Sequence, residues 1–426
     1  MRSTADTKIL ELEGLRGVCA CLVVLDHFGI YLPYKAGWAF GAIKFFALPV
    51  GAPAVMVFFI LSGYVIGHST RGLPASGPFI ADYLLKRFIR LYPIFLIALV
   101  IAFLVAREPI ASAYFALHAL FLQNSLSSVP VISTDGALWS LNFEVVYYIL
   151  FIAIWLFPRA IHGLLAFSAA GLVFSIVAVS DSALPMEILS SAVVASYAFW
   201  LFGLMVERDH PLLSKLVVSS DETRLWLPLL FLAANMATAA PNAILHDLGL
   251  NGGLAAQNFV NAGPIADVFL CALGKKIVRS WAVPLYALSA ATTLIGLGFA
   301  TLAGKFAIMP TYDFALIYAV CATVAAFMRP KSPSARAWRA LAPVGGISYA
   351  IYAIHMPIFQ GATELYPGSL MAVLLAVPAT VAVAIFLEEF LQPRLRRAFF
   401  ALLGKLGVTR PIVPIAALAG AEKPEP

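Results

Sequence analysis

Residues 12–30 read LEGLRGVCACLVVLDHFGI, an apolar stretch interrupted only by Glu13, Arg16, Asp26 and His27. About 20 apolar residues are what an α-helix needs to cross the hydrocarbon core of a bilayer. Runs of this length recur along all 426 residues. A membrane β-barrel would instead show alternating hydrophobicity over about 10 residues at a time. The stretch therefore indicates a helical membrane protein.

The composition agrees with this reading. Hydrophobic residues make up 62% of the chain and charged residues 12%, whereas a soluble domain carries about 25% charged residues. The mean hydropathy is +0.91. These values exclude a soluble globular fold, a disordered chain and a coiled coil. Because every backbone polar group in lipid must be paired within the chain, we predict an all-α, polytopic bundle.

The apolar segments predict ten to twelve transmembrane helices. The segment 256–273 is the weakest because it contains Asn258, Asn261 and Asp267, and we expect it to be re-entrant or interfacial. The stretch 110–123 predicts a short interfacial helix. The twelve segments are 14–32, 49–67, 91–106, 139–157, 161–179, 188–206, 225–241, 256–273, 281–303, 311–328, 342–360 and 369–391.

Basic residues predict the orientation, since short cytoplasmic loops are rich in Lys and Arg. The net charge of +6 lies in such loops, so we expect membrane lipids and not nucleic acid as partners. With twelve spans, both termini and three basic clusters are cytoplasmic. We predict one transmembrane domain over 1–400 and a disordered, basic and then Pro-rich cytoplasmic tail over 401–426. The clusters are Arg71, Lys86, Arg87 and Arg90; Arg329, Lys331, Arg336 and Arg339; and Arg394, Arg396, Arg397, Lys405 and Arg410.

Ionisable groups inside a membrane are costly and are candidates for function. Arg16 and His27 are eleven residues apart, which brings them within about 20° of one helix face and about 16 Å apart along it. A guanidinium at the mouth suits a phosphate, and an imidazole deeper in suits proton transfer. A snorkelling Arg16 and a core His27 are the structural alternative. Asp26 points about 100° away from His27 and is expected to face a neighbouring helix or the lipid headgroups and not to orient His27.

A second group occurs in LWSLNFEVVYY, residues 138–148. Glu144 and Tyr148 share a helix face, with Ser140 one turn earlier. A carboxylate at this depth can orient an imidazole or bind a sugar hydroxyl. For Trp139 and the tyrosines alone, an aromatic belt at the membrane surface is the alternative.

A third group occurs in GGISYAIYAIHMP, residues 345–357. Ser348, Tyr352 and His355 are spaced at i, i+4 and i+7, which is one helical stripe. Hydrogen bonds between helices are the structural alternative for such residues.

Two further segments carry small or basic residues. Arg87 and Arg90 lie at i and i+3 on one face, which suits a phosphate or diphosphate clamp; ordinary positive-inside charge is the alternative. In FFILSGYVIG, residues 58–67, the small residues Ser62 and Gly63 indicate close helix packing; a nucleophilic Ser62 is the less favoured alternative.

The spacing of His, Cys, Asp and Glu along the sequence predicts no metal site.

Taken in order, these segments resemble the membrane-bound acyltransferase family 3 over residues 8–395. That family carries Arg, ten residues and His in its first span, then a Phe-Phe-x-Leu-Ser-Gly segment, Arg-x-x-Arg, Trp-Ser-Leu-x-x-Glu and Ser-Tyr-x-x-Tyr-x-x-His-x-Pro. The family core usually has ten spans, and this chain has extra material around 225–305. The matching residues are Arg16, His27, Arg87, Arg90, Trp139, Ser140, Leu141, Glu144, Ser348, Tyr349, Tyr352, His355 and Pro357.

The resemblance implies a bacterial inner-membrane enzyme that transfers an acyl group, usually acetyl, from cytoplasmic acetyl-CoA to a hydroxyl of a glycan or glycolipid, such as a lipopolysaccharide or an exopolysaccharide. We expect His27 to take the hydroxyl proton and Glu144 or His355 to orient it. Transfer is direct, or it passes through an acyl-enzyme. The residues expected to bind donor or substrate are Arg16, Arg87, Arg90, Trp139, Ser140, Tyr148, Ser348 and Tyr352.

The main rival class is a secondary transporter or a glycan flippase, which also has about twelve spans and buried ionisable residues. Such proteins are often built from inverted repeats with matched broken helices, and the sequence shows neither. Its polar residues also concentrate at helix ends and not at a midplane. A purely structural scaffold gives no reason for intramembrane charges.

Overall fold

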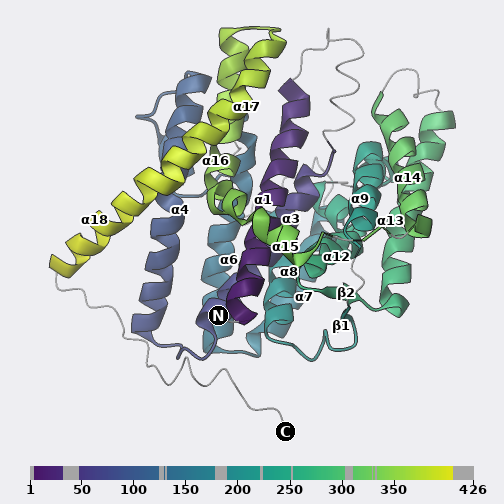
Figure 1. Cartoon of the computed structure of the whole chain (residues 1–426), viewed down its shortest axis with the longest axis horizontal. Coiled ribbons are helices and arrows are strands. Elements are labelled where there is room, and N and C mark those ends of the chain that lie inside the picture. The colour runs from purple at the N-terminus through teal and green to yellow at the C-terminus, as the bar shows by residue number, and fades with distance from the viewer. Residues whose placement is uncertain are drawn as a thin grey trace.

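The computed structural model describes residues 4–31, 48–123, 129, 132–177, 190–220, 224–250, 253–302, 310–328, 330–331 and 333–405. Almost all of these residues are helical, and the long helices pack side by side into a bundle (Figure 1). The helices are α1 (Thr4–Tyr31), α3 (Gly51–Thr70), α4 (Gly77–Ala106), α5 (Ala113–Ala119), η2 (Ser133–Leu138), α6 (Trp139–Leu156), α7 (Ala160–Val177), α8 (Ser191–Glu207), α9 (Trp226–Thr238), α10 (Ala240–Asp247), α11 (Leu254–Val260), α12 (Ala262–Ala272), α13 (Arg279–Leu302), α14 (Pro310–Met328), α15 (Ala335–Ala340), α16 (Ala342–Leu365), α17 (Leu370–Ile385), η4 (Phe386–Leu391) and α18 (Gln392–Lys405).

Each of the twelve predicted apolar segments contains a helix. Within the described residues, however, only eight helices are long and apolar enough to cross a membrane, or nine if the bent pair α9 and α10 is one span. Three further apolar helices fall short of this length, namely α8, α12 and the stretch Phe314–Met328 of α14. The segment 256–273, expected to be re-entrant or interfacial, is divided into α11 and α12, and the stretch 110–123 contains the short helix α5; the position of both at the membrane surface stays a prediction.

Two glycines allow the central helices to cross closely. A Cβ atom on Gly345 of α16 would lie 1.9 Å from the carbonyl oxygen of Glu13 in α1. A Cβ atom on Gly63 of α3 would lie 1.9 Å from the carbonyl oxygen of Trp200 in α8. Small residues at such crossings let backbones approach in a membrane, where dispersion and hydrogen bonds drive association. The packing role predicted for Gly63 is therefore confirmed.

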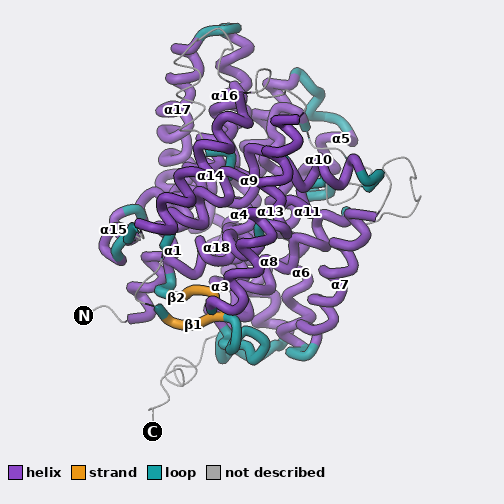
Figure 2. The backbone as a smooth tube through the Cα atoms, turned by 90° about the vertical axis from the view of Figure 1, so that its right-hand side faces the viewer, coloured by secondary structure: helices purple, strands orange, loops and turns teal. Residues whose placement is uncertain are grey.

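One short antiparallel ladder interrupts the all-helical fold. Strands β1 (Val217–Ser219) and β2 (Lys275–Ile277) pair with Val217 opposite Ile277, and they lie at one end of the bundle (Figure 2). The backbone N–H of Ile277 donates to the Asp267 carboxylate at 3.0 Å. The ladder joins the connection after α8 to the connection after α12. The sequence did not predict it, because three-residue strands leave little periodic signal.

Described members of all three basic clusters gather near one end of the bundle. The Arg339 Nε atom lies 3.8 Å from Glu11 Oε1, near the start of α1. The Gln392 side chain at the start of α18 donates to the carbonyl oxygens of Ile89 and Arg90 in α4. The prediction that these clusters share a side is thus consistent with the packing. Helix α18 continues to Lys405, past the predicted domain boundary at 400. The rest of the predicted tail, 406–426, lies outside the described residues.

Candidate active site

A chamber of about 110 Å³ opens between α1, α3, α4, α6 and α16. Its apolar wall includes Phe58, Phe59 and Leu141. Helices far apart in the sequence bring the predicted polar residues to this one space. Eight of the eleven predicted site residues line it, namely Arg16, Arg87, Arg90, Ser140, Glu144, Tyr148, Ser348 and Tyr352.

The chamber has a strongly basic mouth. Arg16, Arg87 and Arg90 meet there with Glu13, and the Arg16 Nη1 atom donates to Glu13 Oε1 at 2.5 Å. The Arg87 guanidinium donates to the Ser69 hydroxyl at 3.2 Å. One carboxylate among three guanidiniums leaves an excess of positive charge, which suits a phosphorylated ligand.

Glu144 lies deeper in the chamber and accepts hydrogen bonds from two hydroxyls. Ser62 donates to Glu144 Oε1 at 2.8 Å, and Tyr148 donates to the same oxygen. The indole N–H of Trp200 donates in turn to the Ser62 oxygen at 3.3 Å. Of the two groups expected to orient His27, Glu144 makes no hydrogen bond with it in the described part of the chain and instead accepts from Ser62 and Tyr148. The partner of Ser62 is a carboxylate and not an imidazole, so the usual activation of a serine nucleophile is not built here.

The second candidate, His355, contacts His27 directly. His27 Nδ1 and His355 Nε2 are 2.7 Å apart. The ring centroids are 5.0 Å apart and the ring planes differ by only 11°. This is the geometry of two nearly coplanar imidazoles joined edge to edge through one N–H···N hydrogen bond.

The partners of His355 assign the tautomers of the neutral pair. His355 Nδ1 lies 2.8 Å from the carbonyl oxygen of Tyr352. A carbonyl oxygen only accepts, so His355 Nδ1 carries the proton and its Nε2 is an acceptor. His27 Nδ1 must then donate, which leaves the lone pair on His27 Nε2. His355 is fully buried and His27 half-buried, so the more accessible ring holds the basic nitrogen.

Tyr352 connects the chamber to this histidine pair. Its hydroxyl donates to the Ala137 carbonyl oxygen at 2.9 Å, so the Ser140 hydroxyl, 2.7 Å away, donates to the tyrosine oxygen. Its backbone carbonyl holds His355. The chamber ends at Ser140 and Tyr352, and His355 lies about 4.5 Å further along α16. The two predicted histidines therefore lie just beyond the inner end of the chamber.

The remaining predicted residues have structural partners. Trp139 does not line the chamber but packs edge-on against Phe59, which does, with ring centroids 6.3 Å apart. Ser348 lines the chamber and donates to the Gly345 carbonyl oxygen at 2.6 Å. Asp26 accepts from the backbone N–H of Gly51 at 3.1 Å, which confirms that it faces a neighbouring helix.

Asp135 is a buried carboxyl that sequence reasoning missed. The Ser, Pro, Asp and Gly pattern around it is typical of an exposed loop, and nothing in the sequence distinguished it from one. In the structure it lies in η2 with no exposed surface, two residues before Ala137, whose carbonyl oxygen accepts from the Tyr352 hydroxyl at 2.9 Å. Asp135 therefore belongs to the surroundings of the Tyr352–His355 end of the site.

A second buried polar group, which we call the amide cluster, lies between α9, α13 and the turn that joins α11 to α12. Asn261 donates to the Asn235 side-chain oxygen at 2.7 Å and accepts from the Ser289 hydroxyl at 2.7 Å. Asn235 also donates to the Thr293 hydroxyl at 3.1 Å. The cluster comprises Asn235, Asn261, Ser289 and Thr293; none of them is ionisable and none lines the chamber.

The family comparison decides the class of the protein. The family described as an acyltransferase domain matches residues 9–389. This chain belongs to the acyltransferase 3 family. It is therefore an acyltransferase, and the match favours that prediction over the rival transporter. No curated protein and no solved structure matches the chain. Among the described residues of this acyltransferase, no group of three His, Cys, Asp or Glu side chains is placed to hold a metal ion.

Proposed function

We propose that this acyltransferase moves an acetyl or other short acyl group from acetyl-CoA to a hydroxyl of a glycan or glycolipid, with His27 as the general base. The observation that carries the proposal is the hydrogen bond from His27 Nδ1 to His355 Nε2. It leaves the His27 Nε2 lone pair to accept a proton. An alcohol attacking a thioester needs such a base.

The chemistry runs in one balanced sequence. The acceptor oxygen attacks the thioester carbonyl while His27 Nε2 takes the hydroxyl proton. The C–S bond then breaks, and the departing CoA thiolate takes the proton back from His27 Nε2. While His27 is an imidazolium, its Nδ1–H bond to neutral His355 is charge-assisted and therefore stronger. His355 acts as a positioning residue, itself held by the Tyr352 carbonyl.

The donor enters at the basic mouth in this proposal. Arg16, Arg87 and Arg90 attract its phosphates, and the thioester arm lies along the chamber past Glu144. Hydroxyl groups at the inner end, from Ser140 and Tyr352, lie where the acyl carbonyl would approach the histidine pair. The Arg16-to-His27 separation of about 16 Å along α1 then spans the donor from its phosphates to its acyl group.

The membrane placement follows from the donor. Acetyl-CoA is cytoplasmic, so the basic end faces the cytoplasm of a bacterial plasma membrane, as the positive-inside rule also indicates. Both termini are then cytoplasmic. Twelve spans satisfy this orientation if the shorter α8, α12 and α14 and the bent α9–α10 pair all cross the membrane.

The test is transfer of radiolabelled acetyl from acetyl-CoA into a bacterial glycolipid extract by the purified protein in vesicles. We expect base-labile label in the glycolipid with the wild type and a transfer rate lower by about 10²-fold or more with His27→Ala. The matched control is His162→Ala, since His162 is exposed and does not line the chamber; its ring lies 3.3 Å from the Arg159 carbonyl oxygen and 5.6 Å from the His210 ring centroid. Full transfer by His27→Ala would overturn the base assignment. Uptake of a solute that fails without His27, with no transfer, would favour the transporter.

A further inference from the structure

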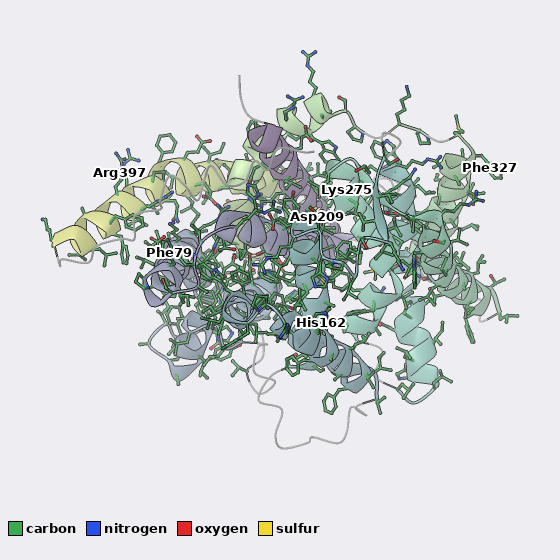
Figure 3. The ribbon with its side chains drawn as sticks, turned by 90° about the horizontal axis from the view of Figure 1, so that it is seen from below. Phe79, His162, Asp209, Lys275, Phe327 and Arg397 are labelled. Atoms are coloured by element: carbon green, nitrogen blue, oxygen red, sulfur yellow. The ribbon has the colours of Figure 1, made fainter. Side chains whose placement is uncertain are left out.

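A larger groove of about 710 Å³ adjoins the mouth of the chamber. It lies between α4 and the start of α18, and Glu13, Arg87 and Arg90 line both hollows. The groove and the chamber therefore meet at these three side chains. Figure 3 shows α18 extending from one edge of the bundle with Arg397 on it.

The position of α18 beside the groove is fixed by its first residues. Helix α17 runs into α18 through η4, a π-helical turn, and π turns within helices are frequent at functional sites. Directly after it, the Gln392 side-chain amide donates to the carbonyl oxygens of Ile89 at 2.5 Å and Arg90 at 3.1 Å. These bonds hold the start of α18 on α4. One turn later, Arg396 and Arg397 line the groove.

The groove is strongly cationic. Within the described part of the chain, neither Arg396 nor Arg397 has a carboxylate at ion-pair distance. Arg396 lies 6.0 Å from the Phe400 ring centroid, and Arg397 Nε donates to the Pro393 carbonyl oxygen at 3.3 Å. A guanidinium has five N–H donors, so both retain donors for a ligand. The charged side chains of the groove are the cationic Lys86, Arg87, Arg90, Arg396 and Arg397 and the anionic Glu13 and Glu388.

We propose that this groove binds the 3′-phosphorylated ADP moiety of CoA, with Arg396 and Arg397 pairing with its 3′-phosphate. The inference rests on the proposed function, in which acetyl-CoA is the donor. The chamber, at about 110 Å³, is too small for a nucleotide, whereas ligand sites usually measure about 300–1,000 Å³. The nucleotide must therefore stay outside while the thioester arm passes Arg87 and Arg90 into the chamber.

The test compares the binding of acetyl-CoA and of 3′-dephospho-acetyl-CoA by calorimetry, in nanodiscs of neutral lipid. For the variant Arg396→Gln/Arg397→Gln we expect the Kd of acetyl-CoA to rise about tenfold or more, because the variant loses charge-assisted hydrogen bonds to a phosphate. The Kd of the dephospho analogue should rise much less. Arg394→Gln is the matched control, because Arg394 does not line the groove and instead donates to the Phe390 carbonyl oxygen.

The outcomes separate this inference from the proposed function. If the wild type binds acetyl-CoA and the double variant binds it with the same Kd, the inference alone is overturned. The same holds if the double variant binds both ligands more weakly by the same factor. No wild-type binding of acetyl-CoA overturns the proposed function. If the double variant binds acetyl-CoA more weakly than the wild type only when anionic lipid is added to the nanodiscs, the groove binds lipid headgroups, and the inference is also overturned. The double variant Arg396→Lys/Arg397→Lys keeps the charge and should restore part of the difference between the two ligands.

Discussion

Two buried polar regions of this bundle look alike in sequence and differ in structure. In the chamber and its histidine pair, ionisable groups such as Arg16, Glu144 and His27 surround or adjoin an open space. In the amide cluster, Asn235, Asn261 and Ser289 satisfy one another through short hydrogen bonds. A polar residue in a membrane helix is thus not a site by itself. Ionisable groups that converge on a cavity are the stronger indication.

The largest effect is expected from removing the base. His27→Ala should lower the acyl-transfer rate about 10²- to 10⁴-fold, which is the usual contribution of a general base, while the protein remains folded. Initial rates of label transfer, with a thermal unfolding curve in detergent, measure both quantities. A rate within threefold of wild type would place catalysis elsewhere.

The next effect tests the histidine partner. His355→Phe removes the acceptor of the His27 Nδ1–H bond. Such a charge-assisted bond is expected to contribute about 1.5–3 kcal/mol, so kcat should fall about tenfold to hundredfold. KM for acetyl-CoA should stay the same, because His355 does not line the chamber. A change in KM with unchanged kcat would mean that His355 acts on donor binding and does not position His27.

A smaller and different effect is expected in the amide cluster. Asn261→Ala removes the side-chain amide that donates to Asn235 Oδ1 and accepts from the Ser289 hydroxyl. Hydrogen bonds between membrane helices contribute about 0.6–1.7 kcal/mol, so the free energy of unfolding should fall by about 1 kcal/mol. The transfer rate per folded molecule should not change. Loss of activity at unchanged stability would erase the distinction between the two regions.

The smallest effect is expected at Ser62. Its hydroxyl donates to Glu144 and accepts from Trp200, so Ser62→Ala removes hydrogen bonds and no nucleophile. We expect the rate to fall by no more than about fivefold, which corresponds to about 1 kcal/mol. Mass spectrometry of the protein after incubation with acetyl-CoA provides the second readout. An acetylated Ser62 would instead support an acyl-enzyme relay.

The helical spacing in the sequence predicted the chamber well. Arg87 and Arg90 at i and i+3, and Ser348 and Tyr352 at i and i+4, do share faces that meet there. Spacing within one helix predicts a face, but it does not say which neighbouring helix that face meets. For this reason the partner of His27 stayed open between two residues until the packing of α1 on α16 was known.

Three features were beyond the sequence. The burial of Asp135 depends on how η2 packs on α16, although its local pattern is that of a loop. The β1–β2 ladder depends on a contact between connections far apart in the chain. The described helices supply eight or nine of the ten to twelve expected spans by length and composition, because apolar segments such as 256–273 are divided into short helices. In each case tertiary packing, and not local pattern, decides the result.

The central claim is that the converging ionisable groups form a CoA-dependent transfer site. Its most direct test is calorimetry of acetyl-CoA binding to the purified protein, beside Arg16→Ala and the control Arg339→Ala, whose arginine is exposed and does not line the chamber. We predict that the wild type and Arg339→Ala bind alike and that Arg16→Ala binds at least tenfold more weakly. No binding to the folded wild type at millimolar acetyl-CoA would contradict the account.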